Sequence, residues 1–388
     1  MKIVHLCMAG PYTQGYSYQE NILPKYHVKL GFDVTVLTSM QTMDAATSTI
    51  KEIHAKQPVI FEENGFKVVR IPFKEKVPKV ISRRFRMYAN FFTYLEIEKP
   101  DIIFTHGTCF VDSRQLVKYL KLHPKVICYS DCHTDYYNSA RNFLSKYILH
   151  GIVWRYFSHL SEPYIKMCFG TTPWRCDFMH EMYGFPLQKL KCIPMGVDDD
   201  NIPSYENARS YVKSKFNIKD SDFLIVTGGK IDEAKNIHHL GYTIRKMENP
   251  NVKLLIFGSI VSTIEDSFEP LRCCPNIIFA GWSDATQVMN YLRASNLCCF
   301  PGTHSTMWEQ AVGVGIPAIY NDWGKSMHHL NINGNCIFID GKNETAIADT
   351  IRGLIFSDKY QNLKQKAEKA SIHFKYSEIA KQSIEMNF

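Results

Sequence analysis

The sequence predicts an α/β protein made of two Rossmann-like domains, each a parallel sheet with helices packed against it. Its 388 residues leave room for two domains, since one domain commonly takes roughly 100–200 residues. Short apolar runs alternate with helical stretches along the whole chain, which is typical of βα units. The series also begins twice with an apolar strand that ends in a glycine turn. With 45% hydrophobic and 21% charged residues, the composition excludes a disordered, collagen-like or coiled-coil chain.

The predicted strands are short apolar runs. In the first half of the chain they are 3–6, 34–37, 68–71, 102–105, 126–129, 168–171 and 191–193, and in the second half 223–226, 253–257, 277–280, 297–300, 318–320 and 336–339. Helices are expected between them. Ser17 and Glu20 form a capping-box pattern, and Gly31 closes the same helix. The stretches 236–247, 285–293 and 343–356 are amphipathic.

The domain boundary is expected in the polar, proline-containing stretch 198–205. We therefore divide the chain into a first domain of residues 1–200, a second of residues 201–370 and a final segment, 371–388. Ligands of open α/β sheets bind beyond the carboxyl ends of the strands, so a cleft between two facing domains is the expected site.

Cysteine usage and the amino terminus indicate the cytoplasm. The twelve cysteines include adjacent pairs in apolar runs and no Cys-x-x-Cys pattern. We interpret them as small buried hydrophobes rather than disulfides or zinc ligands. Residues 1–12 alternate like a strand and lead into a glycine turn, unlike a signal peptide. No apolar run reaches the length of about 18 residues that a membrane span needs.

Positive charge is concentrated in the first half of the chain. The stretch 67–86 holds eight basic residues against the single acid Glu75, and an aromatic cluster follows at 85–94. Basic residues beside aromatics fit an anionic membrane surface or a lipid phosphate, with Arg83, Arg84 and Arg86 as candidate contacts. A solvated loop and helix face is the alternative. Nucleic acid is not expected, because no RNP, KH or helix-turn-helix pattern occurs.

Three loops have the composition of anion sites. The loop 10–15 ends in Gly15 and would let backbone N–H groups approach a phosphate, although a plain turn is the alternative and the pattern is not a dinucleotide fingerprint. The loop that follows Gly228 and Gly229 carries Lys230 and Lys235, which would reach one diphosphate; an ordinary surface loop is the alternative.

The third loop follows the strand 297–300. A helix is expected to begin near Thr306, where free N–H groups favour an anion, and Glu309 lies one turn further, placed to accept hydrogen bonds from ribose hydroxyls. The alternative is that Thr306 is only a cap and Glu309 only a charge favoured by the helix dipole.

These motifs resemble, in order along the chain, the retaining GT-B glycosyltransferases of the group 1 type (glycosyltransferase family four). That family carries a glycine, a basic residue, a lysine and an Asn or Gly in its C-terminal domain, and a donor motif that runs from a glutamate to Gly-x-Pro. The matches here are Gly229, Lys230, Lys235 and Asn236, then 309–317, together with 193–198 before the hinge and the Gly-x-x-Val-x-Val strand 31–36. The resemblance covers about residues 1–355.

The resemblance implies a role for each matching residue. Lys230 and Lys235 would hold the donor diphosphate, Glu309 would hold the ribose, and Gly15 would let the first-domain loop approach the phosphates. His133 would contact the donor sugar, with an ordinary loop histidine as the alternative.

His106 is a further candidate for a site in the first domain. In GT-B enzymes a last helix crosses back onto the first domain, which is the role implied for 371–388; a frayed tail is the alternative.

Two features depart from the family pattern. The family has a second glutamate eight positions before the one matched here, but that position is Pro301 and the loop is shorter. His304, Ser305 or Thr306 would replace its contact with the donor sugar. Lys230 also stands where arginine is common, which keeps the charge and loses the bidentate geometry.

The resemblance implies transfer of a hexosyl or N-acetylhexosaminyl group from a nucleoside-diphosphate sugar to a hydroxyl, with retention of configuration. UDP is the expected nucleotide and GDP the runner-up. No Asp-x-Asp motif occurs at a strand end, so neither a metal nor another cofactor is expected; 198–200 is interpreted as linker. Family precedent is front-face attack in which the departing phosphate acts as the base.

The acceptor is expected on the first domain, where the basic and aromatic segment lies. A polyprenyl-diphosphate-linked saccharide would account for both features, in the assembly of a bacterial surface polysaccharide at the inner face of the plasma membrane. The stretch 147–157 would be a second interfacial helix or a core helix. The alternatives are a catalytically degenerate partner subunit that binds nucleotide-sugar or lipid, and a GT-B sugar-nucleotide epimerase.

Overall fold

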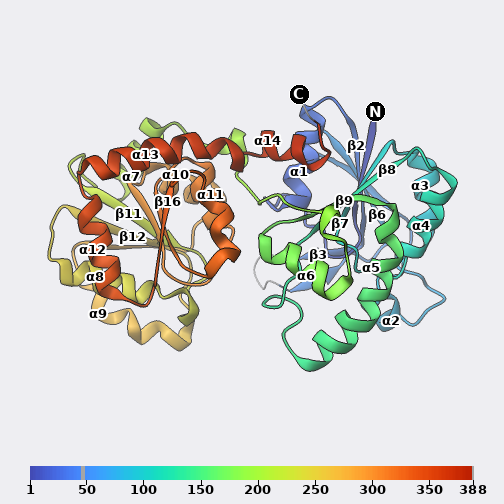
Figure 1. Cartoon of the computed structure of the whole chain (residues 1–388), viewed down its shortest axis with the longest axis horizontal. Helices are drawn as coiled ribbons and strands as arrows, with labels where there is room; N and C mark the ends of the chain where they lie inside the picture. Colours follow the sequence, from blue (N-terminus) through green and yellow to red (C-terminus); the bar gives the residue numbers. More distant parts are fainter. Residues whose placement is uncertain (45–48, 387–388) are drawn as a thin grey trace. The chain divides into compact units, whose positions relative to one another are not determined.

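The chain forms two compact units, each built around its own parallel sheet (Figure 1). The computed structural model describes residues 1–44 and 49–386. Unit 1 comprises Met1–Pro194 together with the residues from Ile379 onward, and unit 2 comprises Met195–Glu378. The division falls a few residues before the expected boundary at residue 200. The returning segment begins at Ile379, inside the expected stretch 371–388.

Unit 1 contains an eight-stranded sheet in the order β10-β9-β8-β7-β1-β2-β6-β5, in which only β5 runs antiparallel to its neighbour. Its strands are β1 (Lys2–Cys7), β2 (Asp33–Ser39), β5 (Val59–Glu63), β6 (Phe66–Ile71), β7 (Ile102–His106), β8 (Ile127–Cys132), β9 (Ile165–Gly170) and β10 (Leu190–Cys192). A separate antiparallel pair is formed by β3 (Gln41–Met43) and β4 (Ile50–Glu52). The sequence prediction missed β3, β4 and β5. Asn64 and Gly65 adopt positive φ and turn β5 into β6, a two-residue hairpin signal that was overlooked.

Unit 2 contains a six-stranded sheet in the order β13-β12-β11-β14-β15-β16, parallel throughout. Its strands are β11 (Phe223–Gly228), β12 (Val252–Phe257), β13 (Ile277–Gly281), β14 (Leu297–Phe300), β15 (Ala318–Asn321) and β16 (Cys336–Ile339). All six coincide with predicted strands to within one or two residues. The central strands β11, β12, β14 and β15 are almost entirely buried apolar runs, which is typical of strands covered on both faces, whereas the edge strands β13 and β16 are mostly half-buried.

The helices connect the strands in chain order. In unit 1 they are α1 (Gln19–Lys29), α2 (Lys79–Arg84), α3 (Phe91–Glu98), α4 (Ser113–Leu122), the π-helix η1 (Leu144–Trp154), α5 (Arg155–Ser161) and α6 (Pro173–Tyr183). In unit 2 they are α7 (Tyr205–Phe216), α8 (Ile237–Met247), α9 (Glu269–Arg272), α10 (Ala285–Ala294), α11 (Met307–Gly313), α12 (Glu344–Leu354) and α13 (Asp358–Ala370), and α14 (Tyr376–Ser383) leads back to unit 1.

The expected capping box at the start of α1 was wrong. Tyr18 is the N-cap, and no side chain caps the helix. A capping box does occur at α10, where Asp284 and Gln287 bond each other's backbone N–H groups. Gly31, with φ of 90°, follows the end of α1 as expected.

The strand orders determine where loops converge. In unit 1 the chain leaves β1 toward β2 and later returns to β7 on the other side of β1, and in unit 2 β11 and β14 are related in the same way. Crevices open at such switch points beyond the carboxyl ends of the strands. The loops after β1, β7, β11 and β14 are therefore where functional side chains should gather.

Two further predictions concern the surface and the thiols. None of the helices within the described part of the chain is long and apolar enough to cross a membrane. All twelve cysteines are free, and most are buried.

Candidate functional site

In unit 2, the loops that follow β11 and β14 pack closely on each other. A Cβ added to Gly302 would come within 2.3 Å of backbone atoms of Ala234 and Lys235, so only glycine fits there. Asn236, in the left-handed conformation with φ of 52°, donates from Nδ2 to the Pro301 carbonyl at 2.9 Å. The two loops that the sequence singled out are thus one structural feature.

Lys235 joins these two loops through its ammonium group. Its Nζ donates to the carbonyls of Thr303 at 2.7 Å and His304 at 3.2 Å. Burial lowers the pKa of Lys235, against the opposing effect of Asp232. Because an ammonium has three N–H donors, one remains for an anion. Lys230, by contrast, is exposed on the same loop.

Glu309 lies in α11 and is completely buried. His304 Nε2 lies 2.8 and 3.0 Å from its two carboxylate oxygens, and His329 Nε2 lies 3.6 Å from Oε1. Burial alone would raise the pKa of Glu309, but His304 and His329 outweigh it and lower the pKa to about 2. The carboxylate is therefore ionised and engaged by histidine.

The remaining predicted residues of unit 2 belong to the same two loops, after β11 and after β14. Gly229 has a φ of 117°, which favours glycine, and Ser305 and Thr306 immediately precede α11. Thr306 is the N-cap, but its side chain makes no capping bond. The sequence analysis missed His329. The adjacent pair His328 and His329, between apolar residues, was the available signal.

In unit 1, polar side chains meet at the carboxyl ends of β7 and β8. His106 Nδ1 lies 2.7 Å from Asp131 Oδ2, and Gln19 donates to the same oxygen from Nε2 at 3.2 Å. His133 Nε2 lies 3.4 Å from that oxygen, with its side chain about one-third exposed. The structure therefore brings His106 and His133 together through Asp131, which the sequence analysis did not select.

The same cluster continues into the interior as a row of histidines. His106 Nε2 lies 3.0 Å from His5 Nδ1, and His5 Nε2 lies 2.9 Å from His27 Nδ1. His27 Nε2 in turn lies 3.1 Å from the Ala380 carbonyl and 3.0 Å from Ser383 Oγ. Asp131, His106, His5 and His27 thus form one continuous hydrogen-bonded chain that ends on the returning C-terminal residues.

His106, Asp131 and His133 also have the spacing of a metal-binding group, with ligand atoms within 4.8 Å of one another. Two ligands about 2.1 Å from a tetrahedral zinc are separated by more than about 3 Å. The 2.7 Å between His106 Nδ1 and Asp131 Oδ2 is instead a hydrogen-bond distance. We therefore interpret this pair as hydrogen-bonded.

The loop that was expected to approach phosphate holds a carboxylate of the chain itself. The Gly15 N–H donates to Glu63 Oε1 at 3.1 Å, Asn21 Nδ2 donates to the same oxygen at 3.1 Å, and the Tyr12 hydroxyl donates to Oε2 at 2.9 Å. Gly15 has a φ of 76°, consistent with its use in a turn.

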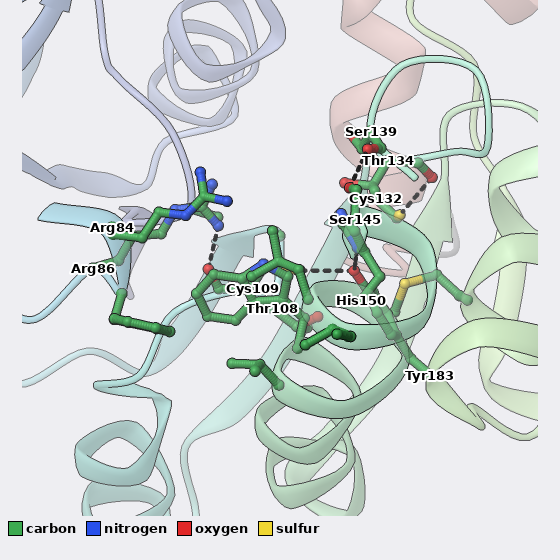
Figure 2. Close-up of a pocket in the computed structure, with 18 of the residues that line it drawn as sticks. Arg84, Arg86, Thr108, Cys109, Cys132, Thr134, Ser139, Ser145, His150 and Tyr183 are labelled. Carbon is green, nitrogen blue, oxygen red and sulfur yellow. Dashed lines mark hydrogen bonds between the residues drawn. The ribbon is translucent and has the colours of Figure 1, made fainter. Parts of the chain in front are cut away.

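A cavity of about 720 Å³ lies in unit 1, between the segment that follows α2 and the π-helix η1. Figure 2 shows Arg84 and Arg86 on one side of it and Thr134, Ser139 and Ser145 on the other. His150 and Tyr183 also line it, and His150 Nδ1 lies 2.6 Å from the Tyr183 hydroxyl.

Arg83, Arg84 and Arg86 differ in their surroundings. Arg83 pairs with Glu52 at 2.5 Å, and Arg84 is exposed at the cavity. Arg86 donates to the Cys109 carbonyl and lies 5.1 Å from the centre of the Trp154 ring. Lys67 and Lys74 also pair with acids, so the basic stretch is less positive than its composition implies.

Comparison with protein-family models gives the decisive observation. Residues 209–370 match the model of glycosyl transferases group 1, and residues 23–201 match that of Glycosyltransferase Family 4. The chain belongs to the group 1 glycosyltransferases. No curated protein matches its sequence.

Solved structures show that this glycosyltransferase has the GT-B fold. Anabaena HepE, crystallised with UDP and glucose, is 14% identical with a TM-score of 0.66, covering 99% of this chain and 98% of that one. A glycosyltransferase from Rickettsia africae is 13% identical with a TM-score of 0.69, covering 99% and 97%. A UDP-GlcNAc 2-epimerase from Neisseria meningitidis, bound to UDP-GlcNAc, is 13% identical with a TM-score of 0.61, and all of both chains is covered. At these identities the likeness concerns the fold.

Proposed function

We propose that this glycosyltransferase moves a hexosyl or N-acetylhexosaminyl group from a UDP-sugar to a hydroxyl of a saccharide acceptor, with retention of configuration and without a metal. The observation that carries the proposal is the joined pair of loops at the β11–β14 switch point, where Lys235, His304 and Glu309 meet. The complex of HepE with UDP and glucose supports the choice of nucleotide.

The two lysines differ in what they offer a diphosphate. Lys235 is held by two carbonyls and keeps one N–H in a fixed direction, whereas the exposed Lys230 reaches the phosphates as a flexible point charge. Fixed donors stabilise developing charge without reorganising during the reaction. The bond from the anomeric carbon to the phosphate oxygen breaks as the acceptor oxygen bonds to that carbon. The acceptor proton passes to the departing phosphate.

His304 takes the place that the missing glutamate leaves beside the donor sugar. Glu309 is completely buried and both its oxygens face His304. The carboxylate therefore acts on the donor through the imidazole, which it holds in one orientation, and the ribose reaches Glu309 only when His304 turns. This arrangement compensates for Pro301 at the position of the family's first glutamate.

The acceptor is a lipid-linked saccharide bound at the unit 1 cavity. Arg84 and Arg86 at one wall fit a diphosphate, and Thr134, Ser139 and Ser145 at the other fit sugar hydroxyls. The apolar side chains beside the cavity are exposed: Phe143, Leu144, Tyr147, Ile148, Ile152 and Tyr156 on and beside η1, and Val80 and Ile81 on α2. They fit the lipid and the face of an anionic membrane. Lys76, shortly before α2, and Lys79, the first residue of α2, are also exposed. On this basis we propose that the enzyme works at the inner face of a bacterial plasma membrane, in the synthesis of a surface polysaccharide.

Thermal unfolding with UDP, GDP, ADP, CMP and their common sugar conjugates tests the donor. A ligand at 100 times its Kd adds about 2.7 kcal/mol of stability, so UDP should raise the unfolding midpoint most. Donor turnover is then followed as UDP release, and the product's anomeric configuration by NMR. A shift with UDP but no turnover with any acceptor would favour the degenerate-partner alternative. No shift with any diphosphate would overturn the proposed site.

A further inference from the structure

The histidine chain of unit 1 has acceptors at both ends. At one end is the Ala380 carbonyl, 3.1 Å from His27 Nε2, and at the other is Asp131 Oδ2, 2.7 Å from His106 Nδ1. Four hydrogen bonds link these ends through three imidazoles, so four protons are needed. Three neutral imidazoles supply only three N–H groups. With the carbonyl as its terminal acceptor, the chain therefore carries one extra proton and a defined direction, in which each ring donates from Nε2 toward the C-terminal residues.

The extra proton belongs at His106. Burial alone would lower the pKa of His106, but the adjacent Asp131 outweighs burial and raises it. Burial, with His27 and His106 near, lowers the pKa of His5 well below its ordinary value, and burial lowers the pKa of His27 to about 4. Of the three rings, His106 beside Asp131 is therefore the one to which the hydrogen-bond count assigns the extra proton, and His5 and His27 are assigned as neutral.

Other polar and titratable groups also surround the row of histidines. Glu20 on α1 acts on His106 in the same sense as Asp131. Gln19 donates to Asp131, and the pKa of the thiol of Cys7, buried nearby, is raised well above its ordinary value by burial. His133 faces the same oxygen from 3.4 Å.

Ser383 provides a second state of the chain. Its hydroxyl lies 3.0 Å from His27 Nε2 and 2.8 Å from the Ala380 carbonyl, so it bonds either one. When Ser383 donates to His27 Nε2, each ring donates in the opposite direction, toward Asp131, and three neutral rings satisfy all the bonds. Removing one proton therefore reverses the whole chain, and Asp131 beside His133 is left with an uncompensated charge.

We propose that His5, His27, His106 and Ser383 are positioning residues through which the docked C-terminal residues set the charge of the His106–Asp131 pair beside His133. This rests on the proposed role of His133 at the substrate. The active state is the one in which His106 is an imidazolium, because Asp131 is then neutralised and does not draw His133 away from the sugar. The docking of Ile379 and the residues after it thereby becomes a requirement for transfer.

The test is the ionisation of His106, followed by two-bond ¹H–¹⁵N NMR of the full-length protein without substrate. Wild type should show His106 protonated at both nitrogens near neutral pH and His5 and His27 as single tautomers with the proton on Nε2. Ser383→Ala removes the donor that the reversed state needs. His106 should then keep its proton to a pH higher by about 0.5–1 unit, the equivalent of one neutral hydrogen bond.

Further variants distinguish control of the His106 charge from mere attachment of the C-terminal residues to unit 1. Tyr129→Phe removes a different contact of the C-terminal residues, the 3.2 Å hydrogen bond from the Tyr129 hydroxyl to the Ile384 carbonyl. This hydrogen bond is not part of the histidine chain. It should leave the His106 titration unchanged. His27→Leu should abolish the coupling to Ser383, and His27→Gln, which both accepts and donates, should restore it in part.

The pH profile of kcat should follow the His106 titration in each variant, with the KM for the donor unchanged. A neutral His106 in wild type near neutral pH, or a titration that ignores Ser383→Ala, would overturn the inference. The NMR readout needs no turnover, so its failure is distinct from a failure of the proposed transfer.

Discussion

His304 Nε2 lies 2.8 and 3.0 Å from the two carboxylate oxygens of Glu309, so the glutamate of the donor motif is held by a histidine five residues before it. His304 lies in the loop before α11, and Glu309 lies in the first turn of that helix. The buried carboxylate fixes the imidazole, and the imidazole keeps the carboxylate ionised.

Replacing either partner should have a different result. Glu309→Gln removes the charge that holds His304, and we expect UDP affinity to fall about 10–100-fold, the equivalent of one charged hydrogen bond. His304→Ala leaves a buried carboxylate without its main donor, so unit 2 should also lose about 1–3 kcal/mol of stability. Calorimetry with UDP and urea unfolding measure the two effects. Equal stability losses in both variants would contradict this assignment.

Replacing Lys235 should lower both folding stability and UDP affinity, whereas replacing Lys230 should lower UDP affinity alone. Lys235→Met removes the donor to the Thr303 and His304 carbonyls, so we expect a loss of about 1–3 kcal/mol of stability together with a 10–100-fold weaker binding of UDP, on the order of one charged hydrogen bond. Lys230→Met changes an exposed side chain, so its stability should stay within about 0.5 kcal/mol of wild type while affinity falls. Unfolding and UDP titration of the pair test this. Full UDP affinity in Lys230→Met would remove Lys230 from the site.

A substitution at Gly302 tests the contact between the loop that follows β11 and the loop that follows β14. In Gly302→Ala the new Cβ lies 2.3 Å from the backbone of Ala234 and Lys235, so the loops must separate. We expect a loss of at least about 1–3 kcal/mol and greatly weakened UDP binding. The matched control is Gly353→Ala in α12, where nothing lies within 4 Å of an added Cβ. It should gain about 0.5–1 kcal/mol from helix propensity and bind UDP normally.

The sequence predicted the parallel sheets well because buried parallel strands are continuous apolar runs. The six strands of unit 2 were all found in this way. The hairpin β3–β4 and the antiparallel β5 were missed, because they are short, only partly buried and have no helix before them. The Asn64-Gly65 turn was a clear signal for β5, since it joins β5 to β6.

The loops after β11 and β14 could be singled out because their glycine and lysine spacing is local in sequence. The histidine row was not, because its members come from distant elements. Strand register places Phe104 opposite His5 and Asp131 opposite His106, and His106 is two residues after Phe104 on the same strand. Alternation puts all of these side chains on one face of the sheet. That relation depends on the strand order, in which β1 lies beside β7, and the sequence does not specify that order.

His150 predicts how unit 1 responds to acid. Burial, with Arg86 and Arg84 near, lowers the pKa of His150 from 6.5 to about 4. The unfolded chain therefore binds the extra proton first as the pH falls. The stability from neutral His150 is complete above about pH 6.5 and is lost as the pH falls toward 4, by up to about 2 kcal/mol at about pH 5.

His150→Gln removes this titration, so urea unfolding of unit 1, followed through Trp154 in the same helix, should depend less on pH between about 6.5 and 4. The matched control is His54→Gln, an exposed histidine of the same unit, which should keep the wild-type pH dependence. The cavity should also keep its shape in His150→Gln, because the amide still reaches a hydroxyl partner in Tyr183. An unchanged acid response in His150→Gln would show that His150 binds protons equally in the folded and unfolded chain over this range, which contradicts a lowered pKa.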